Sequence, residues 1–245
     1  MSVTIEVQCF VGSIRPLPES GRPSGIFKQL LTVPGVIGST GFIDDQQADR
    51  RVHGGPEKAI HLYPANHYRQ LAERFPEAAP QLLAGSIGEN ISAAGFDESD
   101  VRIGDIWALG SARLQVCQPR NPCWKIDERY GVDGMAAYIA EHLLTGWYWR
   151  VITEGVYQPG DCLHCEIAAE GAPSLREAML LWQAHRPDLV RLQQLAEGRL
   201  VDHDAFGGRI GGQRINRPGE KLCRTQSGQN RREQRKTFCF HDDLL

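Results

Sequence analysis

The chain has 245 residues, 41% of them hydrophobic, so it can bury a full core without disulfides or a structural metal. It has no run of about 18 apolar residues, and its first residues lack the pattern of a signal peptide. Basic and acidic residues number 27 and 30, so the net charge is only −3. We therefore expect a cytoplasmic globular protein without a membrane span.

The charge is unevenly spread along the chain. Residues 209–236 hold nine Lys or Arg and two acidic residues, so a segment near +7 follows a body near −10. This segment contains no aromatic residue and no recognisable helix pattern, so nucleic-acid binding is not expected and a solvated or disordered tail is favoured. Seven cysteines at irregular spacing predict mostly free thiols in a reducing compartment.

Many turns and short strands are predicted, because Gly and Pro number 26 and 14. Apolar and polar residues alternate over 3–11, which predicts the first strand. We predict loops or turns over 12–25 and 34–41. Further strands are predicted over 27–33, 59–63, 101–109, 112–117, 147–157 and 162–168.

Helices are predicted at three places. One opens at Pro64 and buries a face from Tyr68 to Phe75. A second is predicted over 135–144, with Asp133 as its cap. After a break near 171–173, a capping box at Ser174 leads a helix to about residue 186, and another helix follows over 188–198. The predicted domains are a β body over 1–170, a helical extension over 171–200 and a basic tail over 201–245.

The segment from Gln118 to Lys125 is the strongest candidate for a reactive site. Two prolines fix its backbone directly after a strand. Cys123 then lies near Arg120 and Lys125, and such cations favour a thiolate. A thiolate is either a nucleophile or a soft metal ligand. A buried structural cysteine beside two surface cations fits the same spacing, so the residues alone leave both interpretations open.

A glycine pair is the second candidate. His53, Gly54 and Gly55 form a turn whose bare N–H groups can bind a phosphate or another anion, and Arg51 and Lys58 flank it. A hairpin turn with a solvated basic rim is the alternative.

Two other motifs are weaker. Asn90, in Gly88-Glu89-Asn90, can hydrogen-bond a ring edge or cap a turn. Cys162 and Cys165 would point to opposite faces of a strand, so we expect no metal site there. The chain lacks the nucleophile-elbow, P-loop and Rossmann glycine motifs.

Short segments follow one another in a characteristic order: Val52–Ala59, Tyr63-Pro64, His67-Tyr68, Gly88–Ile91, Ile103–Asp105 and Gln118–Lys125. Together they resemble the MOSC domain family, named for the C-terminal domain of molybdenum-cofactor sulfurase. More narrowly, they resemble its stand-alone bacterial YiiM-type members. The resemblance covers about residues 5–168. It implies a mostly β fold with a few helices (α+β), a MOSC-type β-barrel body followed by a small helical extension.

The resemblance also implies a cofactor. Family members bind the molybdenum cofactor (molybdopterin), a pterin with a phosphate and a dithiolene, and Cys123 would be the molybdenum ligand or a sulfur-carrying thiol. The implied cofactor-binding residues are His53, Gly54, Gly55, Arg51, Lys58, Asn90, Arg120 and Lys125. At the family level, pyridoxal phosphate binding and a homodimer are also allowed.

The implied function is that of an oxidoreductase. It would reduce N-hydroxylated compounds such as hydroxylaminopurines, a detoxification of N-hydroxylated bases. Electrons would come from a separate reductase, because the chain has no flavin, haem or iron–sulfur motif. The alternative is a carrier without catalysis, in which Cys123 holds a persulfide or the protein delivers the cofactor.

Overall fold

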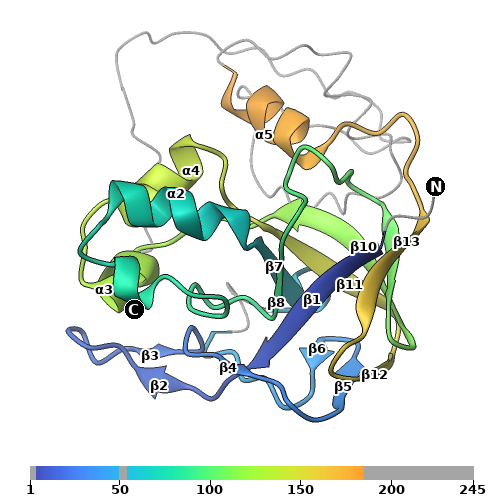
Figure 1. Cartoon of the computed structure of the whole chain (residues 1–245), viewed down its shortest axis with the longest axis horizontal. Helices are drawn as coiled ribbons and strands as arrows, with labels where there is room; N and C mark the ends of the chain where they lie inside the picture. The colour runs from blue at the N-terminus through green and yellow to red at the C-terminus, as the bar shows by residue number, and fades with distance from the viewer. Residues whose placement is uncertain (1–3, 50–53, 185–245) are drawn as a thin grey trace, which may run out of the picture. The chain divides into compact units, whose positions relative to one another are not determined.

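The computed structural model describes residues 4–49 and 54–184 (Figure 1). The chain divides into two units, Met1–Gly207 and Gly208–Leu245, and all described residues lie in the first. Seven strands of this unit form a closed barrel. They are β1 (Thr4–Val11), β7 (Ile60–Pro64), β8 (Ile91–Ala93), β9 (Ile106–Leu109), β10 (Ala112–Pro119), β11 (Trp147–Thr153) and β13 (Cys162–Ile167).

The barrel closes between the first and the last of these strands. The strand order is β13-β9-β10-β11-β7-β8-β1, and β1 pairs back onto β13. Only the β7–β8 pair is parallel; the other pairs of the barrel are antiparallel. The expected mostly β barrel is therefore confirmed. A closed barrel leaves no sheet edge exposed along its wall.

Smaller elements surround the barrel in Figure 1. The short strands are β2 (Arg15–Pro16), β3 (Pro23–Ser24), β4 (Gln29–Leu30), β5 (Gly35–Gly38), β6 (Gly41–Phe42) and β12 (Gly155–Tyr157). The helices are α2 (Asn66–Arg74), α3 (Lys125–Tyr130), α4 (Met135–Glu141) and α5 (Leu175–Gln183), with 3-10 turns η1 (Pro56–Lys58) and η2 (Ala79–Gln81). Strands β2 and β3 form a hairpin, and β12, β5 and β6 form a small sheet.

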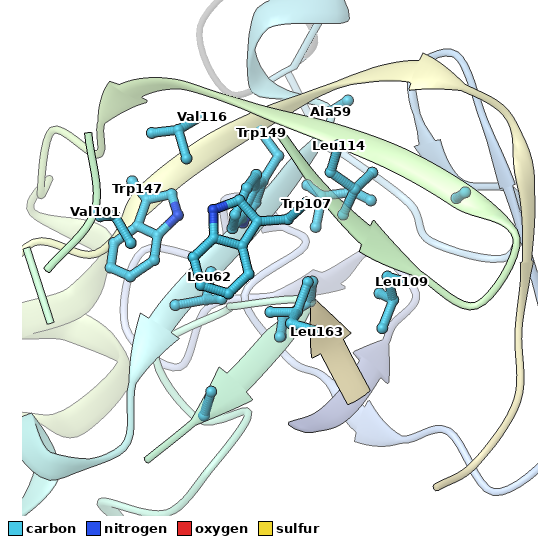
Figure 2. Packing of buried hydrophobic residues seen from close by; sticks show 14 of the residues in the cluster. Ala59, Leu62, Val101, Trp107, Leu109, Leu114, Val116, Trp147, Trp149 and Leu163 are labelled. Atoms are coloured by element: carbon cyan, nitrogen blue, oxygen red, sulfur yellow. The ribbon is translucent and has the colours of Figure 1, made fainter. Parts of the chain in front are cut away.

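Alternation along the strands separates an inner core from an outer wall. Trp147 and Trp149 of β11 point into the barrel and pack with Trp107 of β9, as Figure 2 shows. Tyr148 and Arg150, which alternate with these two tryptophans, face outward because successive side chains of a strand point to opposite faces. The outer wall therefore carries the polar side chains of this strand.

A second core joins the outer wall to the helices. Tyr63 of β7 packs there with Tyr68 and Leu71 of α2 and with Ile126 of α3. The predicted buried face of the helix after Pro64 is thus confirmed, although the helix begins at Asn66. This second core holds α3 against the barrel, directly after the segment that contains Cys123.

Several predicted elements are wrong in detail. Residues 34–41, predicted as a turn, contain β5 and part of β6. Only Gln29–Leu30 of 27–33 and Ile106–Leu109 of 101–109 are strand. In the latter stretch the Asp105 carboxylate accepts the backbone N–H groups of Arg102 (2.8 Å) and Ala169 (2.7 Å), which holds the chain in a turn.

The predicted cap at Asp133 is also wrong. The N-cap of α4 is Gly134, without a side-chain bond. Asp127 of α3 takes this role instead, since its carboxylate accepts the N–H groups of Gly134 (3.0 Å) and Ala136 (2.7 Å). The acid that satisfies a helix start can thus come from the preceding helix.

The capping box at Ser174 is confirmed at the start of α5, where its side chain and that of Glu177 bind each other's backbone. Leu175 and Ala178 of α5 belong to the barrel core. The predicted helix over 188–198 and the basic tail lie outside the described residues. No helix within 4–49 and 54–184 is long and apolar enough to cross a membrane.

Candidate functional site

An open pocket lies on the outer wall of the barrel. Its volume is about 610 Å³, including the solvent at its mouth. Loops before β4 and η1, strands β7 and β11, and the segment between β10 and α3 form its walls. The lining residues include Ser24, Ile26, Lys28, Asp45, Gln47, Lys58, His61, Gly88, Asn90, Arg120, Cys123, Lys125 and Tyr148.

Five predicted site residues line this pocket together: Lys58, Asn90, Arg120, Cys123 and Lys125. They come from segments up to 67 positions apart in the chain. Gly54 and Gly55 are not among the lining residues that the structure describes. Arg51 and His53 lie outside the described residues, so their roles stay predictions.

The Cys123 thiol is half-buried, so a ligand in the pocket can reach it. Its segment is fixed on both sides. The Arg120 N–H donates to the carbonyl oxygen of Gly146 (3.1 Å). At the other end, the Cys123 carbonyl oxygen accepts a hydrogen bond from the N–H of Ile126 in the first turn of α3 (3.0 Å). The prolines at 119 and 122 stiffen the backbone between these points. The structure thus presents this thiol on a rigid segment.

Cations dominate the pocket lining. Among the described residues, Lys28, Lys58, Arg120 and Lys125 line it, together with one carboxylate, that of Asp45. The Arg120 Nη1 atom is buried and has no hydrogen-bond partner among the described residues. Burial lowers the pKa of Lys58. An unsatisfied guanidinium nitrogen in a cationic pocket favours an anionic ligand, which would supply the missing acceptor.

Asp45 neutralises one of these cations in a buried network. Its carboxylate oxygens lie 2.5 and 2.6 Å from Lys28 Nζ, and both side chains are at most 5% exposed. The carboxylate also accepts Asn90 Nδ2 (2.9 Å) and the Gly12 N–H (2.8 Å). Asp45 therefore offsets the positive charge of Lys28.

The Asn90 amide is largely engaged within the protein. Its Nδ2 donates to Asp45 and to the Phe10 carbonyl (3.2 Å), and its Oδ1 accepts the His61 N–H (3.2 Å). The predicted hydrogen bond from Asn90 to a ligand stays a prediction. The geometry supports a role in holding the wall of the pocket.

The two residues before Asn90 shape the same wall. Gly88 has φ of +91°, and a Cβ there would lie 3.0 Å from a side-chain carbon of Ile26, so glycine is required. The buried Glu89 carboxylate accepts Tyr68 O–H (2.5 Å) and Gly85 N–H (2.6 Å). Burial raises the pKa of Glu89, and these hydrogen bonds partly offset the shift.

His61 and Tyr148 form the floor of the pocket. They are register partners between β7 and β11, and their ring centroids lie 5.3 Å apart. Burial and the charges of Arg120 and Lys28 hold the pKa of His61 well below its usual range, so the ring is neutral. Burial raises the pKa of Tyr148, and Arg120 offsets part of this rise. Both groups therefore offer neutral N–H or O–H donors to a ligand.

Sequence reasoning missed Lys28, Asp45, His61 and Tyr148. For His61 and Tyr148 a signal existed, since each lies between two large apolar residues of its strand and therefore points outward, away from the core. No local pattern distinguished Lys28 or Asp45.

The structure places Cys162 and Cys165 on opposite faces of β13, as predicted. Leu163 and Cys165 contact the barrel core, whereas Cys162 lies on the opposite face of β13. Within the described part of the chain, no group of three His, Cys, Asp or Glu side chains could hold a metal ion.

Comparison with known proteins places these features in a family. A MOSC domain model matches residues 49–164. Protein YiiM of Escherichia coli is 38% identical over 149 residues, 61% of this chain and 66% of the relative. A protein of Gibberella moniliformis named "Reductase" is 32% identical over 141 residues, 57% of this chain and 25% of the relative.

The fold comparison agrees. The crystal structure of YiiM from Geobacillus stearothermophilus matches with a TM-score of 0.68 and 29% identity, over 82% of this chain and 94% of that chain. In the sequence comparisons, the matched segment spans just under two thirds of the length of the E. coli relative and a quarter of the length of the fungal one.

Proposed function

Because the chain belongs to the MOSC domain family, which is associated with the molybdenum cofactor, we propose that its pocket binds this cofactor. The protein then reduces N-hydroxylated compounds such as hydroxylaminopurines, with electrons from a separate reductase. The observation that carries the proposal is the meeting of the Cys123 thiol with Arg120, Lys125 and Lys58 in one open pocket.

The residues present fit the cofactor. A thiolate is a soft ligand that suits molybdenum, and Cys123 is the thiol that lines the pocket. The phosphate of the pterin requires cations and N–H donors, which Arg120, Lys125 and Lys58 supply. The unsatisfied Nη1 of Arg120 is the donor with the clearest need for such an acceptor. Pyridoxal phosphate binding stays a family-level prediction.

The reduction of an N–OH group to N–H consumes two electrons and two protons and releases water. When bound, the molybdenum cofactor supplies the two-electron chemistry. The chain's own residues bind and orient. Tyr148 keeps its proton at neutral pH because its pKa is raised, so its O–H can donate to a bound N-hydroxyl oxygen. The neutral His61 beside it adds no charge to the floor of the pocket.

An external electron donor is part of the proposal. The fungal relative named "Reductase" is about four times as long as the segment it shares with this chain, since the match covers 25% of it. The name and the greater length of this relative support a proposal in which the MOSC domain works together with a reductase. Here that module would be a separate protein.

The test replaces the thiol. Cys123→Ser should abolish reduction of 6-hydroxylaminopurine by dithionite-reduced methyl viologen, which bypasses the physiological donor. It should also lower the molybdenum content and the pterin fluorescence after oxidation. Cys162→Ser, at a half-buried thiol on β13 away from the pocket, is the matched control. Full metal and full activity in Cys123→Ser would refute the proposal.

The half-buried position of Cys123 also supports the carrier function. In this case Cys123 holds a persulfide or delivers the cofactor without catalysis. Intact mass spectrometry distinguishes the two functions. One extra sulfur on Cys123, with no molybdenum in any preparation, would favour the carrier.

A further inference from the structure

A second cysteine lies near the same end of β10 but does not line the pocket. Cys117 is only 2% exposed, and its thiol lies between two charged side chains on the outer wall. The thiol donates to Glu57 Oε2 (3.1 Å) and accepts from Arg150 Nε (3.0 Å). Arg150 also binds the Glu57 carboxylate directly through Nη2. These three side chains form a closed triangle.

The triangle depends on an irregularity of the barrel. Val116 and Gln118 pair with Trp149 and Tyr148 of β11, whereas Cys117 has no register partner. A β-bulge of this kind re-aims the extra side chain. Here the bulge aims the Cys117 thiol at η1, the turn that carries Glu57.

The triangle is one of three anchors that hold η1 on the barrel. The Glu57 carbonyl oxygen accepts Gln118 Nε2 (3.3 Å). The next anchor follows directly, as the Ala59 N–H donates to the carbonyl oxygen of Trp149 (3.1 Å). Lys58 lies between these anchored positions and lines the pocket. Its backbone is therefore fixed on both sides.

The same two strands carry the opposite wall of the pocket. Strand β10 leads into Arg120 and Cys123, and β11 carries Tyr148 one residue before the Trp149 anchor. Fixing η1 on these strands fixes Lys58 relative to Arg120. The Glu57 and Arg150 side chains are each 26% exposed, so water screens their ion pair only in part.

We propose that Glu57 and Arg150, joined through the Cys117 thiol, are positioning residues that hold Lys58 for an anionic group of the ligand. The ligand class is a phosphate or pyrophosphate ester. The inference depends on the proposed function only for the presence of an anion in the pocket. Cys117 itself stays protonated and performs no chemistry, since burial raises its pKa to about 12.

The experiment measures the binding of inorganic pyrophosphate by calorimetry and does not use catalysis. Lys58→Ala should weaken binding by about tenfold, as expected for the loss of one charged hydrogen bond. Glu57→Gln should weaken it by about fivefold, because the carboxylate loses its charge. In the Lys58→Ala background, Glu57→Gln should have no further effect, since there is no amine left to position.

Controls separate positioning from folding. Glu166→Gln breaks a similar pair, in which Glu166 of β13 binds Arg113 of β10 at 2.6 Å, away from the pocket. This variant should bind pyrophosphate like the wild type. Arg150→Lys keeps the positive charge but cannot contact both the Cys117 thiol and the Glu57 carboxylate. Its affinity for pyrophosphate should therefore lie between those of the wild type and Glu57→Gln. Arg150→Lys is also the substitute if Glu57→Gln fails to fold.

Three outcomes would overturn the proposal. If the effects of Glu57→Gln and Lys58→Ala on pyrophosphate affinity are additive in the double variant, the triangle does not act through Lys58. Unchanged binding in both Glu57→Gln and Arg150→Lys would remove its role. Absence of pyrophosphate binding by the wild type would remove the anion site. The binding measurement needs no turnover, so a failure of the proposed catalysis leaves this test intact.

Discussion

Cys117 and Cys123 lie at the same end of β10 and each has an arginine nearby, yet their surroundings differ. Cys117 is buried in the triangle with Glu57 and Arg150, and its pKa is raised to about 12. Cys123 is half-buried and lines an open pocket with Arg120 and Lys125. The comparison teaches that a cation beside a thiol is not sufficient for reactivity. Burial and a neighbouring carboxylate can cancel its effect.

The largest expected effect is on alkylation. At pH 8 a thiol of pKa about 12 is ionised in roughly one molecule in ten thousand. Cys117 is also only 2% exposed, so it should react with iodoacetamide far more slowly than the half-buried Cys123. Peptide mapping by mass spectrometry after timed labelling measures both rates in one sample.

Labelling of the unfolded protein is the control, because it gives the alkylation rate of fully accessible cysteines. In urea both cysteines should be labelled equally fast, because the difference arises from the folded surroundings. Similar native rates at the two positions would break the comparison and return Cys123 to a structural role.

The second effect concerns how the free energy of unfolding depends on pH through His61 of the pocket. His61 is neutral in the folded protein because its pKa is held well below 6.5, whereas the unfolded chain binds a proton there as the pH falls below 6.5. The unfolded state then binds more protons, so the free energy of unfolding falls by at most about 1.4 kcal/mol per pH unit below 6.5. Above pH 6.5 this contribution is constant.

Urea unfolding of the wild type and of His61→Gln between pH 7 and pH 5 measures this slope. The difference in the free energy of unfolding between the wild type and His61→Gln should narrow or reverse as the pH falls. Other titrating groups, such as Glu89, are present in both proteins and therefore cancel in this difference. Parallel slopes for the wild type and His61→Gln would mean that His61 titrates freely.

The contrast between the two thiols also shows what the sequence could predict. Cys123, Arg120 and Lys125 are neighbours in one segment, so their meeting in the pocket could be predicted from the chain. Period-two alternation predicted β1 and β10, because alternate residues of each strand contact the barrel core.

The remainder of the site depends on pairings between distant segments. His61 meets Tyr148 only because β7 pairs with β11, and the barrel closes only because β1 pairs with β13. Lys28 meets Asp45 through loops that no local pattern defines. Burial of Cys117 depends on a bulge, which alternation along β10 does not reveal. The resemblance to a family supplied the barrel, but not these contacts.

The smallest effect is on stability, and here the order of the two cysteines reverses. Cys117→Ala removes a buried sulfur with two hydrogen bonds but leaves the Glu57–Arg150 ion pair, so it should cost about 1 kcal/mol. Cys123→Ala removes a half-buried thiol and should cost less than about 0.5 kcal/mol. Urea unfolding at pH 7 resolves this difference in the free energy of unfolding if both variants show the same dependence on urea concentration. A larger cost at Cys123 than at Cys117 would mean that the pocket thiol supports the fold, and the division between a structural and a reactive cysteine would fail.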